Sequence, residues 1–333
     1  MKFSLNKNVK FILKCLICLL PLIAFMAFVN FAPMYFMDEE YPSWRYLKEV
    51  TKGEVGEEYY ETVILGDSVA KSSLIPEMLS DGKCINLAVG GATPIDMYYA
   101  FSDYLENHEA PKNVIILFGP FHYWHVDNYK TRTVYFKSLD IKDALDLYKN
   151  ADLFEAEAIC FEGYKLYEAS CRLGLPTVYL PAINAAHFAG RYDTNKALYD
   201  KIKSQNGYSV FGDKEYCDDV SYEASYKMIE DTGANEILLV YMEGLINLAN
   251  QNGCKASCLH SALNETTYDS MNDTYLGQYY TIVEKMAEFG ENVYCDEKLR
   301  RYPCEYFGDA SHLNEKGAVK YTAEIDEILK QLE

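Results

Sequence analysis

The stretch Thr62–Ser68 (TVILGDS) decides the fold prediction. Its apolar, β-branched run Thr62–Leu65 stops abruptly at Gly66. A short run of this kind, ended by a turn, is typical of a strand buried on both faces of a parallel sheet. Ser68 then opens a segment that reads as a helix as far as Leu79. The stretch therefore predicts a buried strand, a tight turn and the start of a helix.

The same alternation of strand and helix continues outward from this point. Cys84–Ala88 predicts a second strand, which Gly90-Gly91 ends, and Thr93 followed by Pro94 predicts a capped helix start. Further strands are predicted at Asn113–Phe118, Lys255–His260 and Asn292–Cys295, and further helices at Glu236–Asn250, at Tyr279–Phe289 and after Asn314. Alternating strands and helices predict an α/β fold, here a three-layer α/β/α, flavodoxin-like parallel sheet.

Residues 121–235 interrupt this alternation. They are rich in Tyr and in acidic residues, and they read as helical except for one candidate strand, Thr177–Leu180. We therefore expect one domain over residues 61–333 that carries a largely helical insertion at about 121–235. Within the insertion, His187 is a candidate to line a cleft.

The N-terminus predicts a membrane anchor. Cys15–Phe36 holds 22 residues without a charge, and roughly 20 apolar residues suffice to cross a bilayer. No good small-residue cleavage site follows, which favours an uncleaved anchor over a signal peptide or a buried core helix. Residues 1–14 are then a basic cytoplasmic tail, 15–36 the single transmembrane helix, and 37–60 a linker. Lysines before the span and acids after it place the main domain outside the cytoplasm.

Charge separates this head from the rest of the chain. The net charge of the chain is −19, and the only charges in the first 37 residues are Lys2, Lys7, Lys10 and Lys14. The remainder has 27 basic residues against 50 acidic ones, a net charge of −23. This balance argues against nucleic acid and against anionic lipid surfaces as partners. The location would permit disulfides between the body cysteines. No cofactor is predicted, and no metal site either, because Cys254 and Cys258 lack the Cys/His pair of a zinc pattern.

Three residues form a candidate catalytic triad. Ser68 follows the first strand, at the edge of the sheet where α/β proteins bind ligands. Asp309-Ala-Ser-His312 stands near the C-terminus, and a carboxylate three residues before a histidine can orient its ring. We expect Ser68 as nucleophile, His312 as general base and Asp309 as the orienting acid. Taken singly, Ser68 could be only a helix cap and His312 only a surface residue.

The order of these motifs resembles the SGNH/GDSL hydrolase superfamily. The resemblance rests on Gly66-Asp67-Ser68, on Asn86-Leu-Ala-Val-Gly90-Gly91 and on Asp309-Ala-Ser-His312, and it covers about 61–117 and 255–322. With its anchor, the chain looks most like the membrane-anchored branch of DltD-like and polysaccharide O-acetylation proteins. That resemblance implies a cell-envelope glycan or acyl donor as partner, and a membrane-bound O-acyltransferase as a possible second one.

One position departs from the family pattern. Phe121 stands where the family has an asparagine that donates to the oxyanion, and a phenyl ring donates no hydrogen bond. The expected oxyanion donors are then the N–H groups of Ser68 and of Gly90 or Gly91, with His122 as a candidate third. The candidates to line the substrate site are Asp67, Thr93, Tyr123, Trp124 and His125. For Asp67, a structural role in the turn is the competing interpretation.

Together these features predict an extracytoplasmic serine esterase or O-acyltransferase, held in the cell membrane by one helix. It would act on acyl groups, acetyl before others, of cell-envelope glycans. The alternative is a non-catalytic envelope component that binds a glycan or an acyltransferase, and Phe121 is its main support. A nucleotide-binding domain is excluded because neither GxGxxG nor GxxxxGK[ST] follows the first strand.

Overall fold

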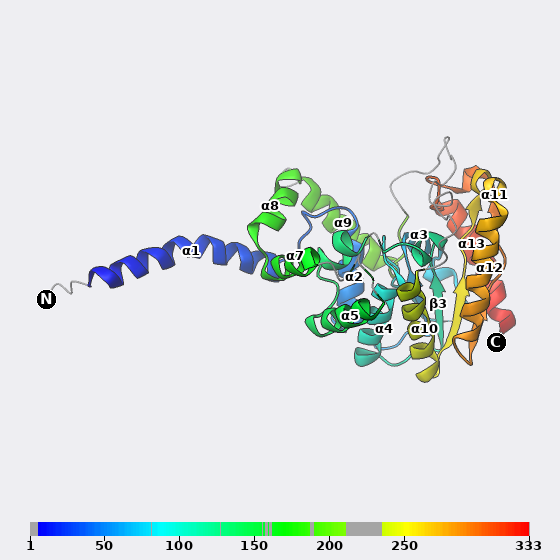
Figure 1. Ribbon diagram of the computed structural model, residues 1–333. Coiled ribbons are helices and arrows are strands. Elements are labelled where there is room, and N and C mark those ends of the chain that lie inside the picture. Colours follow the sequence, from blue (N-terminus) through cyan, green and yellow to red (C-terminus); the bar gives the residue numbers. More distant parts are fainter. Residues whose placement is uncertain are drawn as a thin grey trace.

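A parallel five-stranded sheet forms the centre of the protein (Figure 1). The structure is a computed structural model that describes residues 6–80, 82–126, 128–154, 156, 159, 162–186, 190–210 and 235–332, without the side chains of 120, 121 and 162–164. The strands are β1 (Thr62–Gly66), β2 (Cys84–Asn86), β3 (Asn113–Leu117), β4 (Lys255–Leu259) and β6 (Val293–Cys295). Their order is β2-β1-β3-β4-β6, and every neighbouring pair is parallel. The predicted α/β class is therefore confirmed.

The strand order makes the carboxyl ends of β1 and β3 the expected place for a ligand. Successive strands along the chain occupy positions 2-1-3-4-5, the order in which a doubly wound sheet reverses its winding between its first and third strands. Ligands of such sheets bind outside the carboxyl ends of the strands at this reversal. Ser68, which follows β1, is thus located at the expected edge.

Two apolar cores cover the two faces of the sheet. Val63 and Leu65 of β1 point into the larger core, whereas Ile64 points into the smaller one. The larger core contains residues of α4 (Pro94–Asn107), α10 (Glu236–Gln251) and α12 (Asp273–Glu288), and the smaller contains residues of α3 (Ser68–Ser73) and α13 (Glu315–Leu332). Helices on both faces give the three layers that the alternation predicted.

The first helix is shorter than expected. The helix predicted from Ser68 to Leu79 ends at Ser73, and a separate 3₁₀ turn, η1, follows at Pro76–Met78. Proline lacks the N–H that would continue the helical ladder, and its ring disfavours a helical conformation in the preceding residue. Ser68 is the first residue of α3 and lies close to the end of β1.

The insertion is helical. Its described elements are η2 (Pro120–Tyr123), the π-helical segment η3 (Tyr129–Val134), α5 (Ile141–Leu153), α7 (Glu162–Leu173), α8 (Pro176–Ala185) and α9 (Gly190–Ser204). The strand predicted at Thr177–Leu180 is wrong, because these residues lie inside α8, which Pro176 opens at its first position. Residues 211–234 and the candidate cleft residue His187 lie outside the described residues.

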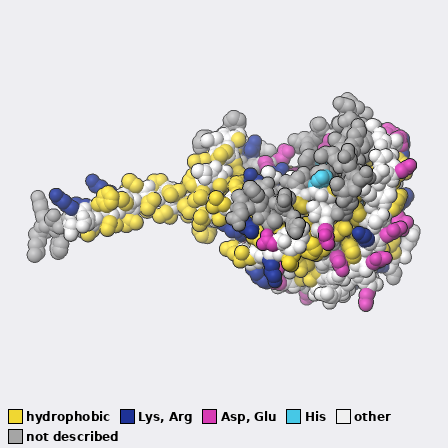
Figure 2. All heavy atoms as spheres, in the orientation of Figure 1, with side chains coloured by type: hydrophobic (Ala, Val, Ile, Leu, Met, Phe, Trp, Pro, Cys, Tyr) yellow, Lys and Arg dark blue, Asp and Glu magenta, His cyan; other side chains and the backbone are white. Residues whose placement is uncertain are grey.

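The N-terminal apolar helix joins the body without a linker. Helix α1 (Lys7–Phe31) has the length and composition to cross a membrane and projects from the body in Figure 1, where α7 and α8 adjoin it. Figure 2 shows hydrophobic side chains over α1, basic ones near its N-terminal end and acidic ones over the body. The first part of the linker predicted at 37–60 is corrected, because Met37 is buried in the larger core and α2 (Tyr41–Thr51) packs on α4 and α9, whereas residues 52–60 form no helix or strand and are mostly exposed or half-buried.

The remaining elements belong to the C-terminal part of the chain. They are β5 (Leu263–Asn264), which pairs with β7 (Arg301–Tyr302), together with α11 (Glu265–Ser270) and η5 (Cys304–Tyr306). The eight cysteines among the described residues are free thiols. Cys258 and Cys295 face each other across β4 and β6.

The close approach of β1 and β3 predicts a strict requirement for Gly66. A Cβ at Gly66 would lie 1.8 Å from the carbonyl oxygen of Leu117. We expect Gly66→Ala to lower the free energy of unfolding of the full chain by about 1–3 kcal/mol, measured by urea unfolding in detergent. The control is Gly277→Ala on the exposed face of α12, where a Cβ meets nothing within 4 Å. It should gain about 0.5–1 kcal/mol. Unchanged stability of Gly66→Ala would contradict the steric argument.

Candidate active site

The turn after β1 presents Ser68 at the start of α3. Asp67 caps this helix, and its Oδ1 accepts the N–H of Val69 at 2.8 Å. Its Oδ2 accepts the N–H of Gly119, just beyond β3, at 2.7 Å. One buried carboxylate therefore fixes the ends of two neighbouring strands relative to each other. Ser68 is the first residue of α3, so its own N–H lacks an acceptor inside the helix.

The structure brings Ser68, His312 and Asp309 together. Ser68 Oγ lies 2.8 Å from His312 Nε2, and His312 Nδ1 lies 2.9 Å from Asp309 Oδ2. The loop holds Asp309 in place, because its Oδ1 also accepts the backbone N–H groups of Ser311 at 2.9 Å and His312 at 2.8 Å. The two residues from the C-terminal loop thus reach the serine across 244 positions of sequence.

The electrostatics of the triad favour one arrangement of protons. Burial opposes ionisation of Asp309, but the hydrogen bond to His312 and the backbone N–H groups hold the pKa of its carboxyl below its ordinary value. An ionised Asp309 accepts a proton-bearing Nδ1, which leaves His312 Nε2 to accept the hydroxyl of Ser68. This is the arrangement in which an imidazole can remove the proton of an attacking hydroxyl.

The Gly90-Gly91 turn lies beside the turn that carries Ser68. The N–H of Val89 donates to the carbonyl of Gly66 at 3.2 Å, so the chain beyond β2 runs alongside the turn that carries Ser68. The N–H of Gly90 donates to Glu40 Oε2 at 3.0 Å. No described residue accepts the N–H of Gly91. Of the two glycines predicted as oxyanion donors, Gly90 therefore has its N–H occupied by a carboxylate, whereas Gly91 does not among the described residues, and the oxyanion role of both stays a prediction.

Glu40 is a site residue that the sequence analysis missed. Its carboxylate accepts hydrogen bonds from the ammonium of Lys71 at 3.0 Å through both oxygens, in addition to the N–H of Gly90. Lys71 lies three residues after Ser68 on α3, a spacing that places the two on neighbouring positions of one helix face. That spacing was a visible signal in the sequence. Glu40, the acidic partner, has no comparable signal in the sequence, because it reads only as one of the acidic residues that follow the predicted anchor.

Four residues predicted to contact a substrate are engaged in contacts within the fold. Asp67 is fully buried, and the two backbone N–H groups described above occupy its oxygens. Thr93 is buried and forms the capping box of α4 with Asp96. Tyr123 and Trp124 are buried in the larger core. A side chain enclosed in this way would contact a substrate only after a rearrangement of the core, so the predicted contacts of these four residues with a substrate stay predictions.

Phe121, His122 and His125 lie in the segment that follows β3. His122 is buried with its Nε2 3.4 Å from Asp67 Oδ2, so that nitrogen faces the buried carboxylate. His125 is half-buried. The side chain of Phe121 lies outside the described residues. His122 as an oxyanion donor therefore stays a prediction. A further amide lies nearby: a Cβ on Gly91 would be 3.1 Å from Nδ2 of Asn128, a residue that the sequence analysis did not single out.

Comparison of the chain with protein-family models, with curated proteins and with solved structures gave no match.

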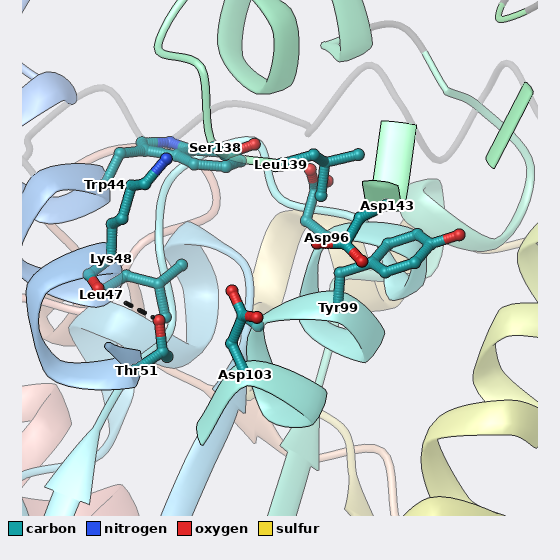
Figure 3. A pocket seen from close by; sticks show the side chains of 11 residues that line it. Trp44, Leu47, Lys48, Thr51, Asp96, Tyr99, Asp103, Ser138, Leu139 and Asp143 are labelled. Carbon is teal, nitrogen blue, oxygen red and sulfur yellow. Dashed lines mark hydrogen bonds between the residues drawn. The ribbon is translucent and has the colours of Figure 1, made fainter. Parts of the chain in front are cut away.

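A second polar cluster lies between α2 and α4 (Figure 3). Trp44 and Lys48 of α2 and Asp96 and Tyr99 of α4 help to line a cavity of about 20 Å³ there. Beside it, the carboxylates of Asp103, Asp140 and Asp143 approach one another within 4.8 Å, close enough to hold a cation. The ammonium of Lys52 already contacts Asp103 at 2.7 Å and Asp140 at 2.9 Å. The ammonium group of Lys52 thus offsets part of the negative charge of this acidic cluster.

The Glu40–Lys71 pair predicts a specific loss of stability in acid. Burial opposes ionisation of Glu40, but the ammonium of Lys71 outweighs burial and lowers the pKa of the carboxyl below its ordinary 4.5. Below pH 4.5 the unfolded chain therefore binds more protons than the folded one. The contribution of the pair is complete above pH 4.5 and is lost as pH falls through the lower, folded-state pKa.

We expect Glu40→Gln to be less stable than wild type at neutral pH, with the difference shrinking as pH falls below 4.5. The measurement is the free energy of unfolding of both proteins, by denaturant titration, across the acid range. Curves that stay parallel would show that the carboxylate of Glu40 is not ionised against Lys71.

Proposed function

We propose that this protein is a serine esterase or O-acyltransferase of the SGNH/GDSL type. The observation that carries the proposal is the continuous hydrogen-bond chain from Ser68 through His312 to Asp309, at 2.8 Å and 2.9 Å. The strand order and the position of Ser68 after β1 add support, because both are expected from the resemblance to the SGNH/GDSL superfamily.

The proposed reaction is acyl transfer through Ser68. Its hydroxyl oxygen attacks the carbonyl carbon of an ester while His312 Nε2 takes the proton, and ionised Asp309 stabilises the imidazolium that results. The negative charge on the carbonyl oxygen would be met by the N–H groups of Ser68 and Gly91. The amide of Asn128, beside Gly91, is a second candidate, besides His122, for the third donor that Phe121 cannot supply. The alcohol leaves with the proton, and water or a second hydroxyl then takes the acyl group from Ser68.

The proposed setting is the outer face of a cell membrane. Helix α1 can span a bilayer by length and composition, and lysines precede its apolar part. The net charge of −23 that remains beyond these lysines favours neutral or weakly charged substrates over polyanions. An acylated cell-envelope glycan is therefore the proposed substrate class, and a membrane-bound O-acyltransferase is a proposed partner.

A second candidate function is a non-catalytic envelope component with the same fold. Two observations favour it. The N–H of Gly90 is occupied by Glu40. In addition, Phe121 stands at the position where the family has an asparagine that donates a hydrogen bond. Such a protein would bind an acylated glycan without turning it over.

The catalytic proposal predicts covalent labelling at Ser68. We expect the full chain in detergent to react with a fluorophosphonate probe and to hydrolyse p-nitrophenyl acetate. Ser68→Ala should abolish labelling and lower turnover by on the order of 10³- to 10⁶-fold, because it removes the nucleophile. The matched control is Ser72→Ala on the same helix, whose hydroxyl donates to the carbonyl of Val69 at 3.3 Å, and it should retain both activities. Equal labelling of Ser68→Ala would contradict the catalytic role. Glycan binding without labelling of the wild type would favour the non-catalytic candidate.

The membrane topology can be tested with a sequon that the chain already contains. Asn272-Asp-Thr274 matches the N-glycosylation signal, and Asn272 is exposed at the start of α12. Translated in the presence of microsomes, the chain should resist carbonate extraction and gain a glycan that Asn272→Gln lacks, because a lumenal body meets the glycosylation machinery. A membrane-bound product without a glycan at Asn272 would contradict the proposed orientation, and a product extracted by carbonate would contradict the anchor.

A further inference from the structure

Two side chains that follow the apolar helix hold the peptide units around Gly90. The indole Nε1 of Trp44 donates to the carbonyl oxygen of Gly90 at 3.0 Å, and Glu40 Oε2 accepts the N–H of the same residue at 3.0 Å. Both side chains are enclosed, with Glu40 5 % and Trp44 3 % exposed. Buried hydrogen bonds of this kind fix a backbone direction, since breaking them leaves an unsatisfied polar group.

The bond from Trp44 also fixes the direction of the next N–H. The carbonyl of Gly90 and the N–H of Gly91 belong to one planar peptide unit, and the described chain contains no cis peptide. In a trans unit the two groups point in opposite directions. With the carbonyl held toward Trp44, the N–H of Gly91 points away from α2, and no described residue accepts it.

Glu40 connects this peptide to the catalytic helix. Its carboxylate binds the N–H of Gly90 and, through both oxygens, the ammonium of Lys71 on α3, one turn after Ser68. The contact is so close that a Cβ on Gly90 would lie 2.1 Å from Glu40 Oε2. A single buried carboxylate therefore sets the spacing between the helix that carries Ser68 and the loop that carries Gly91.

The helix that supplies these contacts is itself held firmly. Trp44 and Leu47 of α2 help to line the small cavity against α4, as Figure 3 shows, and α2 also packs on α9. At its N-terminal side, the buried residues Met34–Met37 connect α2 to the end of α1. The segment from Met34 to Thr51 is thus continuous with the core on one side and with the apolar helix on the other.

We propose that Glu40 and Trp44 are positioning residues that build the oxyanion site by orienting the N–H of Gly91 toward the carbonyl oxygen of the substrate. The inference rests on the proposed acyl transfer at Ser68 and adds a requirement to it. The segment directly after the apolar helix is part of the catalytic apparatus, so the catalytic site is complete only with residues that the sequence assigns to a linker. Gly90 and Gly91 then have separate tasks: Gly90 receives Glu40, and Gly91 receives the substrate.

The test compares Trp44→Phe and Glu40→Gln with wild type in the full chain. A fluorophosphonate probe first counts the active Ser68 sites, and turnover of p-nitrophenyl acetate is then expressed per labelled site. We expect kcat per site to fall between about 10-fold and about 100-fold with KM unchanged, because a misplaced donor weakens transition-state binding only. The control is Tyr46→Phe on the same helix, whose ring packs on Tyr199 instead of the glycine turn and which should keep the wild-type kcat.

The outcomes separate the inference from the function on which it rests. A wild type that is not labelled at Ser68 overturns both. A labelled wild type with unchanged kcat per site in both variants overturns the inference alone, since loss of folded protein lowers only the number of sites. A higher kcat in Glu40→Gln also overturns it, because that result would mean that Glu40 obstructs the oxyanion site.

Discussion

The carboxylate of Asp67 is the constraint on which the candidate site depends. It is completely buried, and it binds the N–H of Val69 in the turn after β1 and the N–H of Gly119 after β3. These two strands flank the point where the winding of the sheet reverses. The N-terminus of α3 is thereby held at that point, which gives Ser68 a fixed position that His312 can reach from the C-terminal loop.

A second buried carboxylate, Glu40, connects the candidate site to the segment that follows the apolar helix α1. It pairs with Lys71 on α3, the helix that begins with Ser68, and with the N–H of Gly90. A buried ion pair is costly unless its remaining hydrogen bonds are satisfied, and here the backbone N–H contributes to satisfying them. Under the proposed function, the pair is retained for geometry: it holds the glycine turn at a set distance from Ser68. This would make the residues after the apolar helix part of the catalytic domain.

Local patterns were enough to predict the sheet and the triad. The strand at Thr62–Gly66 is short, apolar and ended by a glycine, and the order of the motifs predicts that Ser68 and His312 meet at one edge of the sheet. The long-range pairs had no local signature. Glu40 and Trp44 lie in a stretch rich in Glu and Tyr that resembles a solvated linker, and their partners are 31 and 46 residues away. The strand predicted at Thr177–Leu180 failed because a proline at a helix start outweighed an apolar run too short to define a period.

In the proposed acyl transfer, the carbonyl oxygen of the acyl group on Ser68 points to the N–H of Gly91. A crystal structure of the full chain with a phosphonate bound covalently to Ser68 tests it most directly, because the phosphoryl oxygen occupies the position of the oxyanion. We expect that oxygen at roughly 2.7–3.1 Å from the backbone nitrogens of Ser68 and Gly91, with Glu40 still bound to the N–H of Gly90. An adduct on another residue, or an oxygen that points away from Gly91, would contradict it.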